Sequence, residues 1–244
     1  TADVGDIVRS IDVGYTAFAR MPRRELIVNN IQAGDVIVGL ASDGQATYES
    51  AYNGGMGSNG LTSARHDVLQ GAYAEKYPDS FDPGMPSEVA YCGSRSLTEK
   101  VEVAGRSTTV GKLLLSPTRT YLPVLRDLLQ QLRPHIHGLI HCTGGGQTKV
   151  KKFIQNKRVV KDELFPVPYL FELIQKESGT DWREMYQVFN MGHRLEVYLP
   201  EAQAEAVVEI ADRYGIAARV IGRVEPAERE EVVVRTPRGE FLYH

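Results

Sequence analysis

The chain has 244 residues, and its 28 Lys and Arg against 31 Asp and Glu give a formal net charge of −3 at pH 7. This balance supplies no basic field for binding nucleic acid, and no segment approaches the roughly 18 consecutive apolar residues of a membrane-spanning helix. Cys92 and Cys142 stand alone, without the close spacing of a zinc site or a disulfide scaffold, and suit a reducing cytoplasm. We therefore expect a cytoplasmic protein without nucleic-acid or membrane partners.

The first part of the chain alternates short apolar runs with loops. Residues 7–21 alternate loosely and predict one or two strands, and residues 36–40 form an apolar strand. Residues 42–60 are rich in glycine, and a loop longer than about 15 residues is usually functional or disordered. Residues 61–74 predict a helix, and residues 101–109 predict a short strand pair.

The middle of the chain carries helix signals. Ser116 is a good N-cap and Pro117 fits the first helical position, so a helix is predicted to start there and to end before Pro134. Residues 136–140 then read as a strand, and residues 165–176 as a second helix.

The last third predicts a β-α-β unit. Asp181 and Glu184 resemble a capping box that opens a helix before it. The predicted elements are helix 182–188, strand 193–199, helix 200–214, strand 217–224, and a hairpin formed by 231–235 and 240–243. The fold class is therefore α+β, a mixed sheet covered by helices.

Three consecutive glycines follow the predicted strand at 136–140. Glycine can adopt positive φ and lets a ligand approach the main chain, and successive free N–H groups form an anion nest. Thr143, Gly144, Gly145 and Gly146 therefore predict a loop that contacts phosphate or a nucleotide. The alternative is a tight strand-to-helix turn without a ligand.

A second glycine-rich loop leads into the predicted helix at 61–74. Free N–H groups and the helix dipole at such a junction favour an anion, so Gly57, Ser58, Asn59 and Gly60 are candidate phosphate or substrate contacts. The alternative is a mobile surface loop without a ligand.

Several polar residues are candidates for chemistry. Arg119 either binds an anion or forms a structural ion pair, and Asn190 could orient a substrate amide. His135, His137 and His141 could share a strand face, but residues i and i+4 of a strand lie about 13 Å apart, which disfavours a shared metal ion. We expect no metal site there and keep only His141 as a polar residue of the site and a candidate for catalysis.

Five segments in fixed order carry a family resemblance. The segment at residues 136–149 resembles the glycine-rich motif of phosphoribosylformylglycinamidine cyclo-ligases, also called AIR synthetases. Further matching segments are GDVIVGL at 34–40, SNG at 58–60 with Arg65 after it, LSPTRTY at 115–121, and FNMG at 189–192. The resemblance covers most of residues 34–224.

The resemblance implies a C-terminal portion of such an enzyme. Thr1 and Ala2 resemble the end of an upstream family motif, so residues 1–33 would be a remnant of the ATP-binding N-terminal domain. Residues 34–224 would be the AIR-synthetase-like C-terminal domain, and 225–244 a hairpin extension. The missing half would hold most ligands of ATP and Mg²⁺, so the chain alone is expected to fold without turning over ATP.

The implied reaction is the ATP-dependent cyclisation of formylglycinamidine ribonucleotide to aminoimidazole ribonucleotide in purine biosynthesis. The partner would be this small-molecule nucleotide, and the full-length protein would be a homodimer. One alternative is another ATP-using enzyme of the superfamily, of the selenophosphate synthetase, thiamine-monophosphate kinase or formylglycinamidine synthase type. The other is a non-catalytic nucleotide-binding module.

The chain departs from the family pattern at three places. The family usually has His before Ser-Asn-Gly, where this chain has Gly57. About ten residues, 45–54, look inserted. His193 and Arg194 replace the small or apolar residues usual after the family's glycine, which suggests a more polar pocket.

Overall fold

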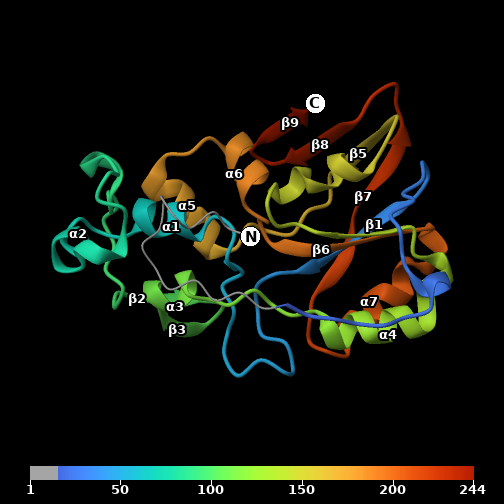
Figure 1. Cartoon of the computed structure of the whole chain (residues 1–244), viewed down its shortest axis with the longest axis horizontal. Helices are drawn as coiled ribbons and strands as arrows, with labels where there is room; N and C mark the ends of the chain where they lie inside the picture. Colours follow the sequence, from blue (N-terminus) through green and yellow to red (C-terminus); the bar gives the residue numbers. More distant parts are fainter. Residues whose placement is uncertain (1–15) are drawn as a thin grey trace.

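A seven-stranded sheet organises the part of the chain that the structure, a computed structural model, describes, residues 16–244 (Figure 1). The strand order is β4-β6-β1-β7-β5-β8-β9, and every neighbouring pair is antiparallel except β5 and β8, which are parallel. The predicted mixed sheet is therefore confirmed. The strands are β1 (Val36–Ala41), β4 (Gly138–His141), β5 (Lys157–Lys161), β6 (His193–Leu199), β7 (Ala218–Pro226), β8 (Glu231–Thr236) and β9 (Gly239–Tyr243).

The predicted β-α-β unit is present and lies at the centre of the sheet. From β6 the chain passes through the 3-10 turn η6 (Glu201–Gln203) and α7 (Ala204–Asp212) to β7. Both strands are antiparallel to β1, so they are parallel to each other, with β1 inserted between them. β1, from the first part of the chain, thus lies between the two strands of a unit formed by its last third.

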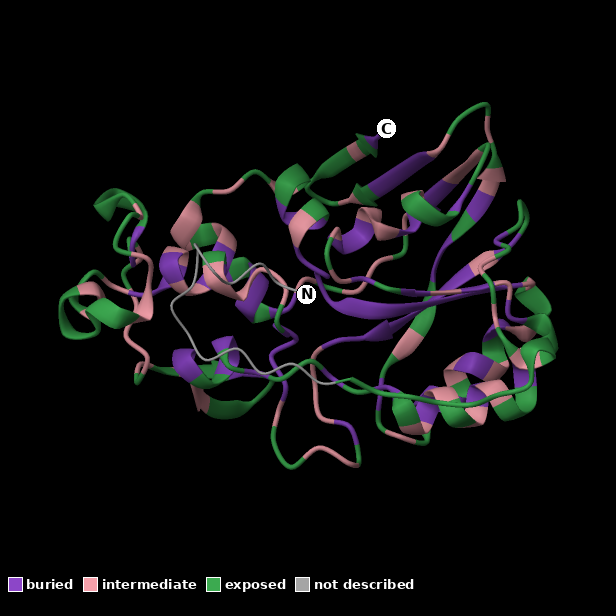
Figure 2. Ribbon diagram, in the orientation of Figure 1, coloured by how far each residue is buried: buried purple, intermediate pink, exposed green. Residues whose placement is uncertain are grey.

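Helices cover both faces of the sheet, and each face has its own core. α4 (Leu122–Leu132) and α7 pack on one face, seen at the lower right of Figure 1. The 3-10 helix η5 (Gly146–Phe153), α5 (Tyr169–Ser178) and α6 (Trp182–Val188) pack on the other. Successive strand residues point to opposite faces, so β1 gives Ile37 to the second core and Val38 and Leu40 to the first. Buried residues accordingly run along the central strands (Figure 2).

A smaller group of elements lies beside the sheet, at the left of Figure 1. The predicted strand pair forms there as a two-stranded sheet of β2 and β3. The elements are α1 (Leu61–Val68), α2 (Ala72–Lys76), η2 (Pro78–Ser80), η3 (Ser87–Val89), β2 (Lys100–Val103), β3 (Arg106–Thr109) and α3 (Val110–Leu114); η1 (Arg23–Glu25) and η4 (Arg133–His135) lie elsewhere. No helix of the described residues is long and apolar enough to cross a membrane.

The predicted helix start at Ser116 and Pro117 is wrong, since α4 begins at Leu122. The Ser116 hydroxyl instead accepts a hydrogen bond from the Gly54 N–H at 2.7 Å. Because the loop at Gly54 is bonded to this hydroxyl oxygen, the oxygen does not cap a helix, and residues 116–121 are non-helical.

Other boundaries differ for local reasons. The predicted helix at 61–74 is broken after Val68, because Leu69 and Gln70 form bridges to residues near Cys92. The helix predicted from residue 165 begins at Tyr169, after Pro168, which fits the extended backbone that precedes it. The strands predicted at 7–21 lie mostly outside the described residues, and residues 16–21 contain no strand.

The predicted C-terminal hairpin forms, but it is part of the main sheet. β8 and β9 pair around the turn at residues 236–239, and β8 also pairs with β5. Tyr243 is buried in the core, and its hydroxyl donates to the Arg183 carbonyl oxygen at 2.7 Å. The hairpin is thus the edge of the domain's sheet rather than an appendage.

Gly222 offers a test of the sheet's central packing. A Cβ at Gly222 would lie 2.0 Å from the Val160 carbonyl oxygen. We expect Gly222→Ala to lower the free energy of unfolding by about 1–3 kcal/mol in urea denaturation, because backbone atoms of β5 must move. The control is Gly71→Ala, whose Cβ would meet the Tyr91 oxygen at an ordinary 3.6 Å. Equal stability of the two variants would contradict this assignment.

Candidate anion-binding site at one end of the sheet

The two glycine-rich loops meet at one end of the sheet. They follow β1 and β4, which both run antiparallel to β6, so their C-terminal ends lie beside the start of β6. Backbone hydrogen bonds join Ser42 to Gly192 at 3.0 Å and Cys142 to Arg194 at 2.6 Å. The fold therefore brings together the two segments that the sequence marks as candidate phosphate contacts.

The loop after β4 keeps free backbone donors. Gly144, Gly145 and Gly146 have φ of +61°, +130° and +47°, a region that side chains rarely tolerate. A Cβ at Gly146 would also lie 2.5 Å from the Phe189 carbonyl oxygen. Among the described residues, the N–H groups of Gly144 and Gly145 have no hydrogen-bond partner. Two free donors before η5 form the nest that an anion would use.

The loop after β1 is ordered by hydrogen bonds. The N–H groups of Gly54 and Gly55 are bonded to the side chains of Ser116 and Asn53 at 2.7 and 2.8 Å. The Gly57 N–H is bonded to the Ser116 carbonyl at 3.3 Å, and a bridge between Gly44 and Asn53 closes the apparent insertion. Hydrogen bonds thus order this loop, while the N–H groups of Asn59 and Gly60, directly before α1, have no hydrogen-bond partner among the described residues.

Both glycine-rich loops contribute residues to one cavity. A cavity of about 740 Å³ is lined by Asn59 and Gly145, by the cations Lys152 and Arg183, and by the carboxylates Asp181 and Glu184. The Asn59 amide donates to the Val188 carbonyl oxygen at 3.0 Å, which fixes its position at the rim. Gly60 has φ +78°, and a Cβ there would lie 2.5 Å from the Phe189 ring. The exposed Ser58 donates its N–H to Thr118 Oγ1 at 3.3 Å.

Arg119 is engaged in a structural ion pair and is not available to an anion. Its Nε and Nη2 donate to the Glu49 carboxylate at 2.9 and 2.7 Å, and Nη1 donates to the carbonyls of Ala41 and Asp43. Burial would raise the pKa of Glu49, but the hydrogen bonds from Arg119, the Ala46 N–H and Asn53, together with the charge of Arg119, lower that pKa. Of the two interpretations open for Arg119, the geometry favours the ion pair. Glu49 belongs to the stretch that looks inserted.

Both polar atoms of the Asn190 side chain are likewise hydrogen-bonded within the protein. Its Oδ1 accepts from the Ser42 hydroxyl at 2.6 Å and the Gly192 N–H at 3.2 Å. Its Nδ2 donates to the Gly55 carbonyl at 2.8 Å. Asn190 therefore ties the loop after β1 to the turn before β6, instead of offering its amide to a substrate.

The three candidate histidines lie in different surroundings. His137 Nδ1 lies 2.8 Å from the Asp35 carboxylate, and His135 ends η4. His141 is exposed at the end of β4, directly before the glycine-rich loop. Protein atoms around the ring partly desolvate it, and this, followed by the charges of Arg194 and Lys149, lowers the pKa of His141 below its ordinary value and favours the neutral imidazole at pH 7. A neutral imidazole beside the loop can donate or accept one hydrogen bond.

A buried ionic network that the sequence analysis missed lies behind the loop. Lys161 on β5 pairs with Glu196 on β6, and both side chains are completely buried. Lys161 also donates to the main-chain and side-chain oxygens of Gln147, at 2.7 and 3.0 Å. Glu196 accepts further from His193 Nε2 at 2.9 Å and the Tyr198 hydroxyl at 2.6 Å. Burial would raise the pKa of Glu196, but Lys161, followed by His193, lowers it to about 2.

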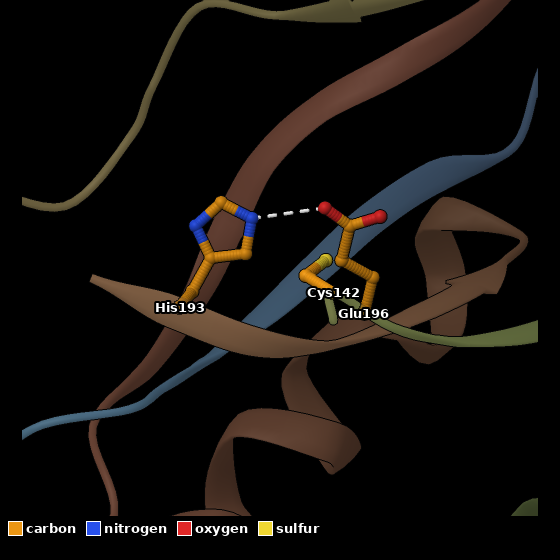
Figure 3. Close-up of side chains that lie close together, drawn as sticks. All are labelled: Cys142, His193 and Glu196. Carbon is orange, nitrogen blue, oxygen red and sulfur yellow. Dashed lines mark hydrogen bonds and ion pairs between the residues drawn. The ribbon is translucent and has the colours of Figure 1, made fainter. Parts of the chain in front are cut away.

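Cys142, His193 and Glu196 are close enough to suggest a metal site (Figure 3). Their ligand atoms lie within 4.8 Å of one another. Lys161, however, already supplies the positive charge, and burial raises the pKa of the Cys142 thiol well above its ordinary value, so no thiolate is present. It is the one such group of three within residues 16–244, and it does not fit Mg²⁺, which prefers oxygen ligands.

Comparison with known proteins gives this end of the sheet a context. A family model described as AIR synthase related protein, C-terminal domain, matches residues 32–235. Phosphoribosylformylglycinamidine cyclo-ligase of Methanosarcina mazei is 30% identical over 225 residues, which cover 92% of this chain and 55% of that protein. The cyclo-ligase of Methanocaldococcus jannaschii is 31% identical over 226 residues, covering 92% and 54%. The chain thus spans about half the length of the curated relatives it matches.

Solved structures resemble the chain more distantly. The hydrogenase maturation protein HypE, solved in complex with ATP, is 17% identical with a TM-score of 0.48, covering 88% of this chain and 52% of that one. A likeness at this level supports no inference about function.

Lys161 provides a test of the buried network. We expect Lys161→Met to lower the free energy of unfolding by about 3–5 kcal/mol at pH 7, because Glu196 is left as an unpaired buried charge. In the control, Arg235→Met breaks an exposed pair with Glu240 and should cost within about 1 kcal/mol. Chemical denaturation of both variants measures the difference. A similar small loss of stability in both would show that Glu196 does not depend on Lys161 for neutralisation.

Stability should also respond to acid through Glu196. Its pKa is about 2 in the folded protein against an ordinary 4.5, so its contribution is complete above pH 4.5 and is lost as the pH falls towards 2. We expect Lys161→Met/Glu196→Gln, which removes both charges, to have a flatter stability profile than the wild type over that window. Unfolding free energies measured at several pH values give the slopes; identical slopes would contradict the assignment.

Proposed function

The chain belongs to the family of AIR synthase related proteins, C-terminal domain, and on that premise we propose that it forms the C-terminal part of a phosphoribosylformylglycinamidine cyclo-ligase. The substrate would be formylglycinamidine ribonucleotide and the product aminoimidazole ribonucleotide. The names of the curated relatives, each about twice as long as the matched region, support this choice within the superfamily.

The reaction closes an imidazole ring with ATP as the phosphoryl donor. The formyl oxygen of the substrate takes the γ-phosphoryl group, the amidine nitrogen attacks the formyl carbon, and phosphate leaves with that oxygen; the nitrogen loses a proton. A protein accelerates such a sequence mainly by positioning the groups and neutralising charge. The residues of this chain would contribute the positioning.

The free N–H groups of Gly144 and Gly145 carry the proposal. They lie beside the cavity lined by Gly145 and Asn59, and we infer that they hold the phosphate of the substrate's ribose. Thr143 continues the same loop, and neutral His141 stands at its start as a hydrogen-bonding group. Arg119 and Asn190 are left out of this ligand set, because their polar atoms are bonded within the protein.

We assign no step to Mg²⁺ within the described residues. ATP, when bound, supplies the phosphoryl group, and the carboxylates for its metal would come from elsewhere in the protein that contains this chain. Among residues 16–244, the one group of potential metal ligands is Cys142, His193 and Glu196, and its carboxylate is already paired with Lys161.

Gly145→Val tests the phosphate loop. Gly145 has φ +130°, and a branched side chain there would be strained and would cover the free N–H groups. We expect the affinity for ribose 5-phosphate, measured by isothermal titration calorimetry, to fall at least about tenfold, the loss of charge-assisted hydrogen bonds. Gly105→Val is the control, because its φ is +71° and a Cβ there would meet nothing within 4 Å.

The substrate class is tested in the same experiment. Formylglycinamidine ribonucleotide should displace ribose 5-phosphate from the wild-type chain more effectively than thiamine monophosphate does. Stronger displacement by thiamine monophosphate would favour a different enzyme of the superfamily. Unchanged affinity in a folded Gly145→Val variant would count against the loop as the phosphate site.

A further inference from the structure

Arg194 is a buried cation that no described carboxylate neutralises. Only 3% of its surface is exposed, and no acidic side chain of residues 16–244 forms an ion pair with it. Its Nη2 donates to the carbonyls of Gly55 and Met56 at 2.6 and 2.8 Å. Its Nε has no hydrogen-bond partner in the described part of the chain.

The other buried cations of this region each form an ion pair with a carboxylate. Arg119 is paired with Glu49, and Lys161 is paired with Glu196. Burying a charge is expensive unless it is paired, so an anion bound beside Arg194 would offset a cost that the other two cations avoid. Burial is the largest influence on the pKa of Arg194 and lowers it, and the nearby Arg119 lowers it further. An anion near Arg194 would relieve both effects.

The guanidinium of Arg194 occupies the space of a side chain at position 57. A Cβ built on Gly57 would lie 1.9 Å from Arg194 Nη1 and 2.5 Å from Nη2. Gly57 also has φ +64°, so the loop bends over the guanidinium. Arg194 can lie there because residue 57 has no side chain. Two departures from the family pattern, Gly57 for His and Arg194 for a small or apolar residue, are thus coupled sterically.

Arg194 also joins the two glycine-rich loops. Its carbonyl accepts from the Cys142 N–H at 2.6 Å, at the start of the loop with free donors. Its guanidinium contacts the loop after β1 through Gly55 and Met56. Its charge is also felt by His141, whose pKa it lowers. Arg194 therefore contacts both glycine-rich loops, one through its main chain and the other through its guanidinium.

We propose that Arg194 is an anion-binding residue of this site, which neutralises the phosphate monoester of the substrate. This rests on the proposed phosphate site and adds a residue and a charge to it. Arg offers permanently charged donors, so it provides a cation at every physiological pH.

The test measures ribose 5-phosphate binding to the 244-residue chain by isothermal titration calorimetry at several salt concentrations. Arg194→Met should weaken binding at least about tenfold and reduce its salt dependence, and Arg194→Lys should retain part of the affinity. Gly57→Ala should also weaken binding, because its Cβ displaces the guanidinium. Gly179→Ala is the matched control: its φ is +68°, but nothing lies within 4 Å of its Cβ.

Thermal unfolding separates this role from a structural one. If Arg194 serves only to hold Gly55 and Met56, Arg194→Met should lower the melting temperature and leave the affinity unchanged, which would overturn the proposal. Removing an unpaired charge should instead leave the melting temperature equal or higher. If Arg194→Met does not fold, Arg194→Lys and Gly57→Ala carry the same test.

The outcomes also distinguish this proposal from the proposed function. Loss of binding in Gly145→Val together with wild-type binding in Arg194→Met and Gly57→Ala would leave the phosphate loop standing and refute the role of Arg194. A wild-type chain that binds no ribose 5-phosphate would refute the phosphate site itself, and the role of Arg194 with it.

Discussion

The buried pair of Lys161 and Glu196 is the interaction on which this end of the sheet depends. It joins β5 to β6, two strands that are not neighbours in the sheet, and reaches η5 through Gln147. Removing two charges from water costs several kcal/mol per ion, so such a pair contributes little net stability over apolar side chains. Its effect is to define geometry: three acceptors surround the ammonium, and three donors surround the carboxylate.

Gln147 transmits that geometry to the glycine-rich loop. While its oxygens bind Lys161, its side-chain amide donates to the carbonyls of Asn190 and His193. The preceding Gly146 packs so closely on α6 that any side chain there would meet the carbonyl oxygens of Tyr186 and Phe189. The end of the loop is therefore fixed, and the N–H groups of Gly144 and Gly145 are held in place before any anion arrives. A preorganised site avoids the entropic cost of ordering a loop on binding.

Local patterns in the sequence predicted the elements that local forces determine. The β-α-β unit follows from hydrophobic periodicity, and the cap of α6 is formed by Asp181, whose carboxylate accepts from the Arg183 N–H at 2.8 Å. The prediction failed at Ser116 because the Gly54 N–H that competes for its hydroxyl is 62 residues away. The Lys161–Glu196 pair could not be predicted for the same reason, although a charged residue inside an apolar strand such as β6 is a signal that a buried partner exists.

The sequence analysis predicted the glycine-rich loops of the candidate site, but it did not predict which charged side chains are paired there. Both glycine loops could be identified from composition, because positive φ has a residue signature, and the fold placed them together. The roles of Arg119 and Arg194 could not be identified, since each depends on what reaches it in space. The apparent insertion brings Glu49 to Arg119 and neutralises it, whereas the missing side chain at Gly57 admits Arg194 and leaves it unpaired.

The Glu49 carboxylate and the absence of a side chain at Gly57 both affect the positive charge of the candidate site. With Arg119 paired, positive charge near the nest comes from other described residues: Lys152 and Arg183 line the cavity beside Gly145, and Arg194 lies buried against the loop after β1. The stretch that carries Glu49 and the glycine at position 57 act on two neighbouring arginines in opposite ways, because one arginine gains an ion pair and the other is left without one. The proposed site thus combines a buried, unpaired guanidinium with two free backbone donors, and positive charge together with free N–H groups favours the binding of a phosphate group.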